Sequence, residues 1–150
     1  MNLAGYDFEL VCVIAPIRAP NGEVCRYMPQ AAFKNERLLP LNRYGEGPFC
    51  KFKIPNGYKQ SGVYALLVSE RVQYVGECNN LSQRYNMGYG NISPRNCFKG
   101  GQETNCRVNN LIYQAAVLGD PVSLWFHQTA SFKIAELEIL AIQRWNWNRR

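Results

Sequence analysis

The sequence lacks any apolar run long enough to cross a bilayer. Its apolar stretches are short, such as Ala65–Val68, whereas a transmembrane helix needs about 20 mostly apolar residues. The N-terminus has no basic start followed by an apolar core, so we expect no secretory signal. The 150 residues contain no internal repeat and no low-complexity tract. Together these absences predict one ordinary domain in the cytoplasm.

Histidine is scarce, and the cysteines are not spaced as in metal or redox motifs. His127 is the single histidine, and no two of the six cysteines have the two-residue spacing of a zinc knuckle. A site built from Cys97, Cys106 and His127 is conceivable, but reduced, unligated thiols are the better interpretation for a cytoplasmic protein. A disulfide-rich secreted protein would need a signal peptide and would show no free thiols.

Acidic residues are outnumbered. The chain has 17 Lys and Arg against 11 Asp and Glu, a net charge of +6 and a pI near 9.1. With 47% hydrophobic and 19% charged residues it is neither a disordered tail nor a coiled coil. The positive excess favours a polyanionic partner such as nucleic acid.

The first 60 residues contain most of the prolines and little regular pattern. Two strand-like runs, Phe8–Ile14 and Val24–Tyr27, flank the turn signal Asn21-Gly22 and predict a hairpin. Between Lys34 and Lys59 the chain is expected to be extended and irregular, with six basic residues against Glu36 and Glu46.

From Ser61 onward the periodicity is more regular. Two β-rich runs joined by a short polar turn predict a hairpin, and amphipathic runs predict helices. Asn80 is placed to cap the first helix, and Gly119 to end the second. The expected elements are strands Gly62–Val68, Val72–Val75 and Val122–His127, and helices beginning at Asn80, at Thr104 and at Phe132, the last running to Arg144.

This order predicts an α+β fold, with an antiparallel three-stranded sheet flanked by helices. The expected organisation is a β-rich and irregular N-terminal extension over residues 1–60 and a core over residues 61–150. Both are expected to be parts of the same domain.

The predicted hairpin contains two tripeptides, Gly62-Val63-Tyr64 and Tyr74-Val75-Gly76, with nine residues between their tyrosines. Arg84 follows eight residues after Gly76, Glu136 lies on the last predicted helix, and Asn148 follows twelve residues after Glu136. In this order and spacing the sequence resembles the GIY-YIG nuclease superfamily, which includes homing endonucleases, a repair incision subunit and several type II restriction enzymes. The resemblance covers about residues 61–148, and the family shares the predicted order of strands and helices.

The resemblance implies a small GIY-YIG-like domain and a divalent-metal-dependent endonuclease that hydrolyses DNA phosphodiester bonds. It implies that Tyr64 activates or orients the attacking water and that Tyr74 helps to position the scissile phosphate, although which tyrosine is the base stays open. It also implies that Glu136 holds Mg²⁺ or Mn²⁺, and that Arg84 and Asn148 complete the catalytic set.

The chemistry of these residue types fits that reaction. A phenol has an ordinary pKa of about 10, so a tyrosine base needs a nearby cation. Arginine presents a planar fork to two phosphate oxygens, and one carboxylate with waters is a normal Mg²⁺ arrangement. Glu138 is a rival for Glu136, about 200° away around the helix. The twelve-residue distance to Asn148 favours Glu136.

Two features depart from the family pattern. Many members have His or Tyr four residues after the arginine, where this chain has Gly88 between Tyr85 and Tyr89. The segment Asn86–Gly101 is a long insertion, in which basic and amide side chains alternate with aromatic ones. Such mixtures suit phosphate and base contacts, although a glycine-rich surface loop is the simpler interpretation. The nucleic-acid contacts that we predict are Lys51, Lys53, Arg95, Lys99 and Arg107.

A type II restriction-type enzyme acting on double-stranded DNA is the first functional interpretation. A symmetric target would imply a homodimer or a transient pair. The nearest alternative is a structure-specific or mobile-element nuclease. The alternative of a different class is a catalytically inactive nucleic-acid-binding domain with the same fold.

Overall fold

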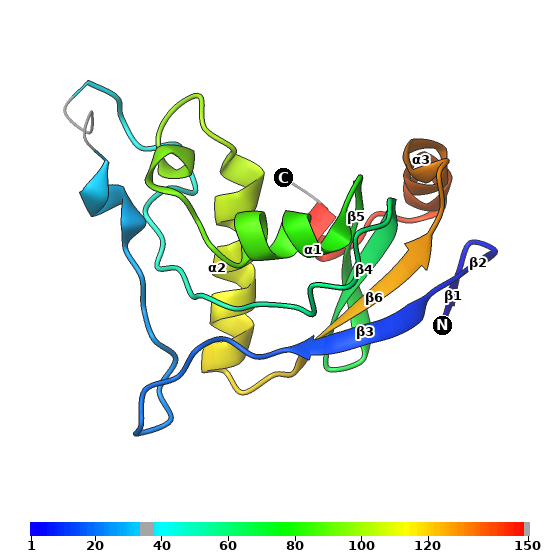
Figure 1. Cartoon of the computed structure of the whole chain (residues 1–150), viewed down its shortest axis with the longest axis horizontal. Helices are drawn as coiled ribbons and strands as arrows, with labels where there is room; N and C mark the ends of the chain where they lie inside the picture. The colour runs from blue at the N-terminus through cyan, green and yellow to red at the C-terminus, as the bar shows by residue number, and fades with distance from the viewer. Residues whose placement is uncertain (34–37, 149–150) are drawn as a thin grey trace. The chain divides into compact units, whose positions relative to one another are not determined.

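The computed structural model describes residues 1–33 and 38–148 (Figure 1). The chain divides into two units. Unit 1 comprises Met1–Ile14, Ile54–Arg84 and Asp120–Arg150, and unit 2 comprises Ala15–Lys53 and Tyr85–Gly119. The first 60 residues therefore contribute to both units. Within the described ranges, no helix is long and apolar enough to cross a bilayer.

Unit 1 is built on a four-stranded antiparallel sheet with the order β3-β6-β4-β5. The strands are β3 (Glu9–Ile14), β4 (Gly62–Val68), β5 (Arg71–Cys78) and β6 (Val122–Gln128). β4 has the predicted bounds, and β5 is longer than the predicted Val72–Val75. The hairpin between them turns at Ser69 and Glu70, both with positive φ, as the polar turn predicted.

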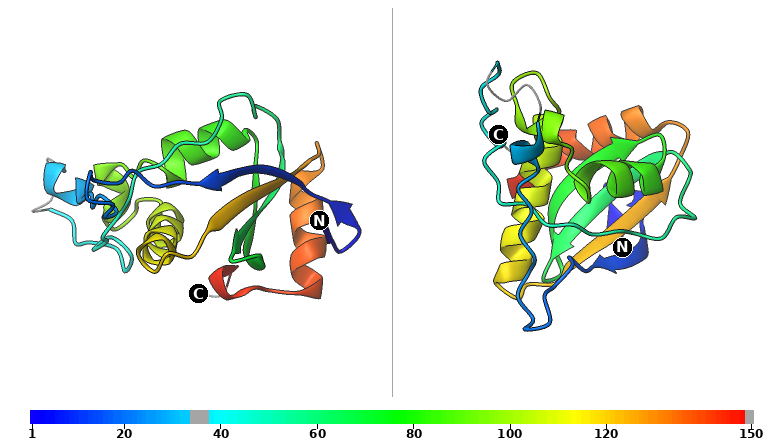
Figure 2. Two further views of the ribbon diagram at one scale, coloured as in Figure 1. Left: turned by 90° about the horizontal axis from the view of Figure 1, so that it is seen from below. Right: turned by 60° about the vertical axis from the view of Figure 1, so that its left-hand side comes forward.

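The prediction of three strands is wrong, because β3 joins the sheet beside β6 (Figures 1 and 2). The predicted hairpin between Phe8–Ile14 and Val24–Tyr27 is also wrong. The turn at Asn21-Gly22 forms, but it closes only an isolated bridge between Arg18 and Val24 in unit 2. β3 finds a longer partner in β6, and Ile14 in the strand and Phe8 just before it are only 4% and 2% exposed. Burial of apolar side chains, rather than the nearest turn, decides which strands pair.

The two faces of this sheet carry different residues. On one face Val63, Ala65, Leu67 and Val75 form a core with Phe8 and with two residues of helix α3 (Phe132–Ile142), Ala135 and Ile139. The other face carries Tyr64, Leu66, Leu124 and Phe126, which the strand register aligns. All four are buried. β4 is therefore the central strand, buried on both faces, while β5 is an edge strand.

Short elements complete unit 1. A small hairpin, β1 (Asn2–Leu3) with β2 (Tyr6–Asp7), precedes β3 and was not predicted. Helix α1 (Leu81–Arg84) follows β5, and the Asn80 side chain accepts a hydrogen bond from the Gln83 amide, which confirms the predicted cap. A 3-10 turn, η4 (Asn146–Asn148), follows α3.

Unit 2 contains one long helix, α2 (Glu103–Val117), with extended chain around it. A π-helix (Tyr85–Tyr89) and the 3-10 turns η1 (Pro29–Ala32) and η3 (Pro94–Cys97) lie in its loops. Residues 34–37 of the predicted basic segment lie outside the described residues. Phe49, Ile92, Cys97, Phe98 and Cys106 form the core of this unit.

A buried amide on α2 holds the extended chain of unit 2 in place. Asn109, 0% exposed, accepts a hydrogen bond from the Cys50 amide and donates to the Cys50 carbonyl, at 2.9 and 2.8 Å. The same side chain donates to the Tyr89 carbonyl at 2.6 Å. Three backbone groups from distant parts of the sequence are thereby satisfied by one side chain, as buried polar groups require.

We predict that Gly62→Ala destabilises the protein by about 1–3 kcal/mol or more, because a β-carbon at residue 62 would meet the His127 carbonyl oxygen and lie 2.6 Å from the Phe126 ring. β4 and β6 would have to separate. Gly57→Ala is the matched control, since it has nothing within 4 Å, and should change stability by no more than about 0.5 kcal/mol. Urea denaturation measures both, and equal midpoints would contradict the prediction.

Candidate active site

Tyr64 and Tyr74 lie on the same face of the sheet, because Tyr64 pairs with Gly76 and Leu66 with Tyr74. Their ring centroids are 6.1 Å apart and the ring planes are inclined by 34°. Gly76 leaves the space that the Tyr64 ring occupies: a β-carbon at residue 76 would lie 2.6 Å from Tyr64 Cζ. The Tyr64 ring therefore extends across β5 toward the edge of the sheet. Tyr64 is 1% exposed, whereas Tyr74 is only partly buried.

Asn148 binds the outer edge of the same strand. Its side-chain carbonyl accepts a hydrogen bond from the Val75 amide at 3.0 Å, and its amide group donates to the Val75 carbonyl at 2.7 Å. The side chain thus takes the place of a further strand between Tyr74 and Gly76. This geometry makes Asn148 a positioning residue for β5, and its predicted catalytic role stays a prediction.

Arg84 is the last residue of α1, and its position depends on how that short helix is attached. Ser82 donates a hydrogen bond to the Pro55 carbonyl at 2.7 Å and accepts one from the Tyr58 amide at 3.0 Å. Burial raises the pKa of Cys78, at the end of β5, to about 12, and Arg84 is among the influences that act in the opposite direction. The positive charge of Arg84 therefore acts near the end of β5.

Glu136 lies partly buried on α3, beside two charged side chains. Burial raises the pKa of its carboxyl, the negative charge of Glu77 raises it further, and Arg144 lowers it. Glu138 is exposed on the same helix and accepts a hydrogen bond from the Tyr6 hydroxyl. Of the two rivals, Glu136 is the carboxylate with a second acid beside it.

The predicted residues thus form two groups that meet at β5. Tyr64 and Tyr74 belong to one side of the strand, and Glu136 belongs to the helix that covers the other. Arg84 lies on α1, which follows the strand. Val75 and Glu77 lie on the face of β5 toward that of α3, while Tyr74 and the bare backbone of Gly76 form the other face. Since β5 is an edge strand, residues on either face of it lie along the same edge of the sheet. All five predicted catalytic residues lie in unit 1.

Sequence reasoning missed Glu77. It follows Tyr74-Val75-Gly76 directly, and its place in the strand already put it on the face opposite Tyr74. With Glu136 it provides oxygen donors of the kind that Mg²⁺ prefers, and a cation would relieve the repulsion between the two carboxylates. The donor chemistry at Glu136 therefore fits a hard divalent cation. In the described part of the chain no group of three His, Cys, Asp or Glu residues gathers at one place.

The residues around Gly88 lie in the π-helix of unit 2. Tyr85 and Tyr89 are both 0% exposed, and their rings meet edge to face with centroids 5.1 Å apart. The Phe52 ring lies 6.4 Å from that of Tyr85. These rings belong to the interior of unit 2. His127, in unit 1, has Nδ1 2.8 Å from the Asp7 carbonyl oxygen and packs against Tyr6.

The five predicted nucleic-acid contacts all lie in unit 2. Lys51, Lys53, Arg95 and Lys99 are exposed, and the Arg95 guanidinium donates to the Lys99 carbonyl at 3.1 Å. Arg107 is 9% exposed and its guanidinium lies 5.9 Å from the Tyr44 ring centroid. Burial leaves Arg107 little surface for a phosphate.

We predict that Glu77→Gln lowers the pKa of Glu136, because it removes a neighbouring negative charge. In the folded protein the raised pKa keeps the Glu136 carboxyl protonated to a higher pH than usual, and the carboxylate forms as the pH rises through that pKa. In Glu77→Gln the carboxylate should therefore form at a lower pH. A ¹³C NMR titration of the metal-free protein measures the change. Glu138→Gln is the control and should leave the Glu136 titration where it is. The same curve in all three proteins would contradict the assignment of Glu77.

Comparisons with known proteins give a structural neighbour only. No protein family matches the sequence, and no curated protein is significantly similar to it. Among solved structures, the chain is similar to a mutant of bacteriophage T4 EndoII, with a TM-score of 0.52 and 22% sequence identity. The match covers 73% of this chain and 86% of the phage protein. At this identity the likeness shows that the two proteins share a fold.

Proposed function

We propose that this protein is a Mg²⁺-dependent DNA endonuclease, of the type II restriction kind, that hydrolyses phosphodiester bonds. The observation that carries the proposal is the arrangement along β5. A tyrosine pair lies on one side of this edge strand, a pair of carboxylates lies on the other, and Arg84 lies on the short helix that follows the strand. The fold shared with bacteriophage T4 EndoII, an endonuclease by its name, supports the same activity.

Each side chain has a separate part in this proposal. Arg84 presents its guanidinium fork to phosphate oxygens, where negative charge increases in the transition state. Tyr64 orients the attacking water and, when its hydroxyl has ionised to the phenolate, accepts the proton of that water. Tyr74, which is more exposed, holds the scissile phosphate. Glu136, with Glu77 beside it, holds the cation. When bound, Mg²⁺ supplies positive charge that stabilises the phosphate and lowers the pKa of water and phenol.

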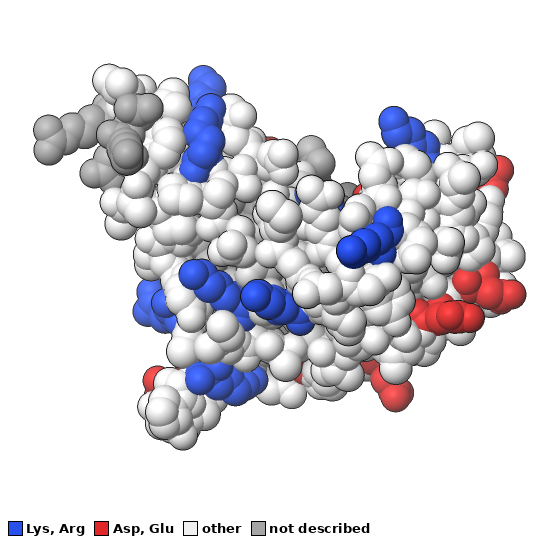
Figure 3. All heavy atoms as spheres, viewed as in Figure 1, with Lys and Arg blue, Asp and Glu red and all other residues white. Residues whose placement is uncertain are grey.

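DNA as the substrate is supported by the distribution of charge. Unit 2 contains 10 Lys and Arg against 4 Asp and Glu, a balance of +6, whereas unit 1 contains 7 of each and is neutral. Several of the basic side chains are visible on one face in Figure 3. Unit 2 thus holds the excess charge that attracts a polyanion, and unit 1 holds the residues for chemistry. A symmetric double-stranded target would be cut by a homodimer.

A structure-specific or mobile-element nuclease is the alternative with the same chemistry. The alternative without chemistry is a nucleic-acid-binding domain, in which the residues along β5 would only stabilise the sheet. Incubating the protein with duplex, single-stranded and RNA substrates, in Mg²⁺ and in EDTA, separates these possibilities. Cleavage that requires Mg²⁺ supports an enzyme, and binding without cleavage supports the inactive domain.

We predict that Glu136→Ala abolishes cleavage, by several orders of magnitude in rate, while DNA binding changes little. Metal binding needs the carboxylate, whereas the basic residues that attract DNA lie in unit 2. Glu138→Ala is the control and should cleave normally, because its carboxylate binds Tyr6. Plasmid cleavage and a gel-shift assay measure both properties. If Glu138→Ala were inactive and Glu136→Ala active, the prediction that Glu136 holds the metal would be wrong.

We predict that Tyr64→Phe lowers the cleavage rate about a hundredfold or more, the usual worth of a group that orients or deprotonates water. Only the hydroxyl is removed and the ring still packs beside Gly76, so stability should change by no more than about 1 kcal/mol. Single-turnover cleavage and thermal unfolding give the two values. Wild-type cleavage by Tyr64→Phe would leave Tyr64 with a packing role alone.

A further inference from the structure

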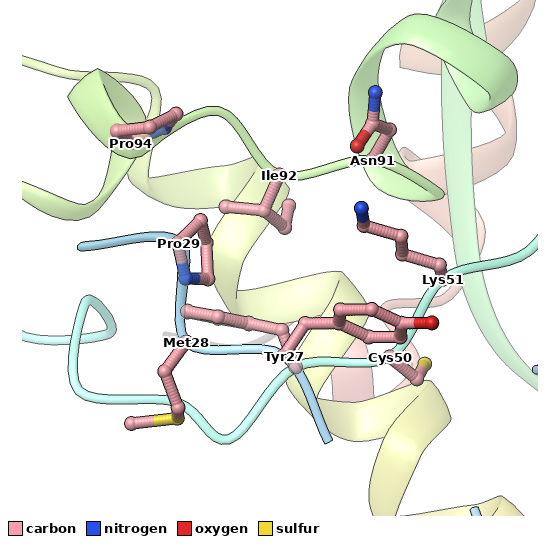
Figure 4. Close-up of a pocket in the computed structure, with 9 residues that line it drawn as sticks. Tyr27, Met28, Pro29, Cys50, Lys51, Asn91, Ile92 and Pro94 are labelled. Carbon is pink, nitrogen blue, oxygen red and sulfur yellow. The ribbon is translucent and has the colours of Figure 1, made fainter. Parts of the chain in front are cut away.

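Unit 2 contains two adjoining hollows, which share Lys51 and Asn91 and which we call together the groove. The first, about 320 Å³, is lined by Tyr27, Met28, Pro29, Phe49, Cys50 and Ile92 as well as Pro94 (Figure 4). The second, about 510 Å³, also has Lys53, Asn86 and Ile17 in its wall. Both volumes fall in the range of about 300–1,000 Å³ that is usual for small-molecule sites. The described residues that line the groove include no acid.

The two lysines of the groove are held on a fixed piece of extended chain. Phe52 between them is 2% exposed and its amide donates to the Gly90 carbonyl at 3.2 Å. Since side chains alternate along extended chain, Lys51 and Lys53 point outward together, about 6–7 Å apart. This is close to the separation of successive phosphates along one nucleic-acid strand. The Cys50 backbone, next to Lys51, is held by Asn109.

The first hollow combines apolar walls with polar groups at its rim. The Lys51 ammonium lies 4.5 Å from the centroid of the Tyr27 ring, a cation–π contact. Figure 4 shows Lys51 extending over this ring toward the loop that carries Asn91 and Ile92. Asn91 is exposed and offers an amide, which can both donate to and accept from a base edge. Met28, 43% exposed, adds an apolar surface.

The aromatic and apolar walls of the first hollow suit the flat faces of a base, whereas its polar rim suits the edges of a base and the phosphates. Inside a duplex the base faces are covered by stacking, and only edges and phosphates are accessible. A concave site with an aromatic ring, apolar walls and lysines is therefore suited to a base outside the stack, together with its phosphates.

We propose that the groove binds an unstacked nucleotide of the nucleic-acid substrate. The base lies in the first hollow against Tyr27 and Met28, the Asn91 amide binds its edge, and Lys51 and Lys53 bind the flanking phosphates. The proposal rests on the proposed nuclease function and specifies its substrate: a strand that is single, or that becomes unstacked when the protein binds it.

The test measures binding of the full chain in EDTA, so that no cleavage occurs. The probes are a labelled single strand, the same sequence as a duplex, and a strand of equal length with all bases removed. Base stacking on an aromatic ring changes affinity by about 5–150-fold per base. We expect the normal single strand to bind more tightly than the abasic strand by a factor in this range. Equal affinity for these two strands would overturn the proposal, because phosphates alone would then account for binding.

Variants assign the effect to the groove. Tyr27→Leu should weaken binding of the normal strand about 5–150-fold and leave the abasic strand unchanged. Asn91→Ala, which removes a hydrogen bond to the base edge, should weaken binding of the normal strand about 2–12-fold and also leave the abasic strand unchanged. Lys51→Met, which keeps an apolar stem over Tyr27, should weaken both strands and reduce the salt slope for a single strand by about 0.7. Lys133→Ala, an exposed lysine in unit 1, is the matched control and should behave as wild type. Unchanged base dependence in Asn91→Ala and Tyr27→Leu would overturn the assignment.

A cleavage assay keeps this result separate from the proposed function. Cleavage in Mg²⁺ without base-dependent binding would overturn the groove proposal and leave the nuclease. Base-dependent binding without cleavage of any DNA would support the groove and overturn the nuclease. A duplex that binds as well as the single strand, and whose 2-aminopurine fluorescence shows unstacking on binding, would support a base displaced by the protein.

Discussion

Tyr64 can extend across β5 only because residue 76 has no side chain. This close approach ties the sequence to the site, since it requires that Tyr64 of the central strand pair with Gly76 of the edge strand. A one-residue slip of β5 would bring a larger side chain under the ring and reverse the faces of Tyr74 and Glu77. Asn148 then fixes the same strand from its open side by two hydrogen bonds to Val75. The tyrosines and the carboxylates therefore keep their sides of β5 as long as this register holds.

Chemistry and charge belong to different parts of the chain. Unit 1 is neutral and holds every predicted catalytic residue, while unit 2 holds the positive excess and the groove. Electrostatic attraction is long-ranged and weakened by salt, whereas catalysis depends on short distances. A division of this kind lets surface residues of unit 2 change without disturbing the geometry along β5. It also means that affinity and rate can be altered by separate substitutions.

The sequence was most informative where local pattern and packing agree. β4 has the bounds that its β-rich run predicted, and Asn80 caps α1 because both partners lie within three residues. The strand Glu9–Ile14 was predicted to exist but was given the wrong partner. Its true partner, β6, lies more than a hundred residues away, and no local signal marks such a pairing.

The candidate site was only partly accessible to sequence reasoning. Spacing to Asn148 selected Glu136, and the geometry adds that Glu138 is occupied by Tyr6. Glu77 was overlooked because it matters only together with Glu136, which a different element, α3, brings near it. A single sequence does not reveal that the two carboxylates are neighbours. Arg107 was predicted as a nucleic-acid contact, and a single sequence did not reveal that it is 9% exposed on α2 with its guanidinium near the Tyr44 ring.

The amide of Asn109 has a consequence for how unit 2 opens. Its side-chain oxygen accepts a hydrogen bond from the Cys50 N–H, 59 residues away in the sequence. Its side-chain nitrogen donates to the Tyr89 carbonyl, 20 residues away. If either segment detaches from α2, a buried polar group is left unpaired, which costs free energy. Hydrogen exchange at the Cys50 amide thus reports the opening of its contact with Asn109 on α2. The lysines that flank the groove stay in place for as long as the helix beneath them does.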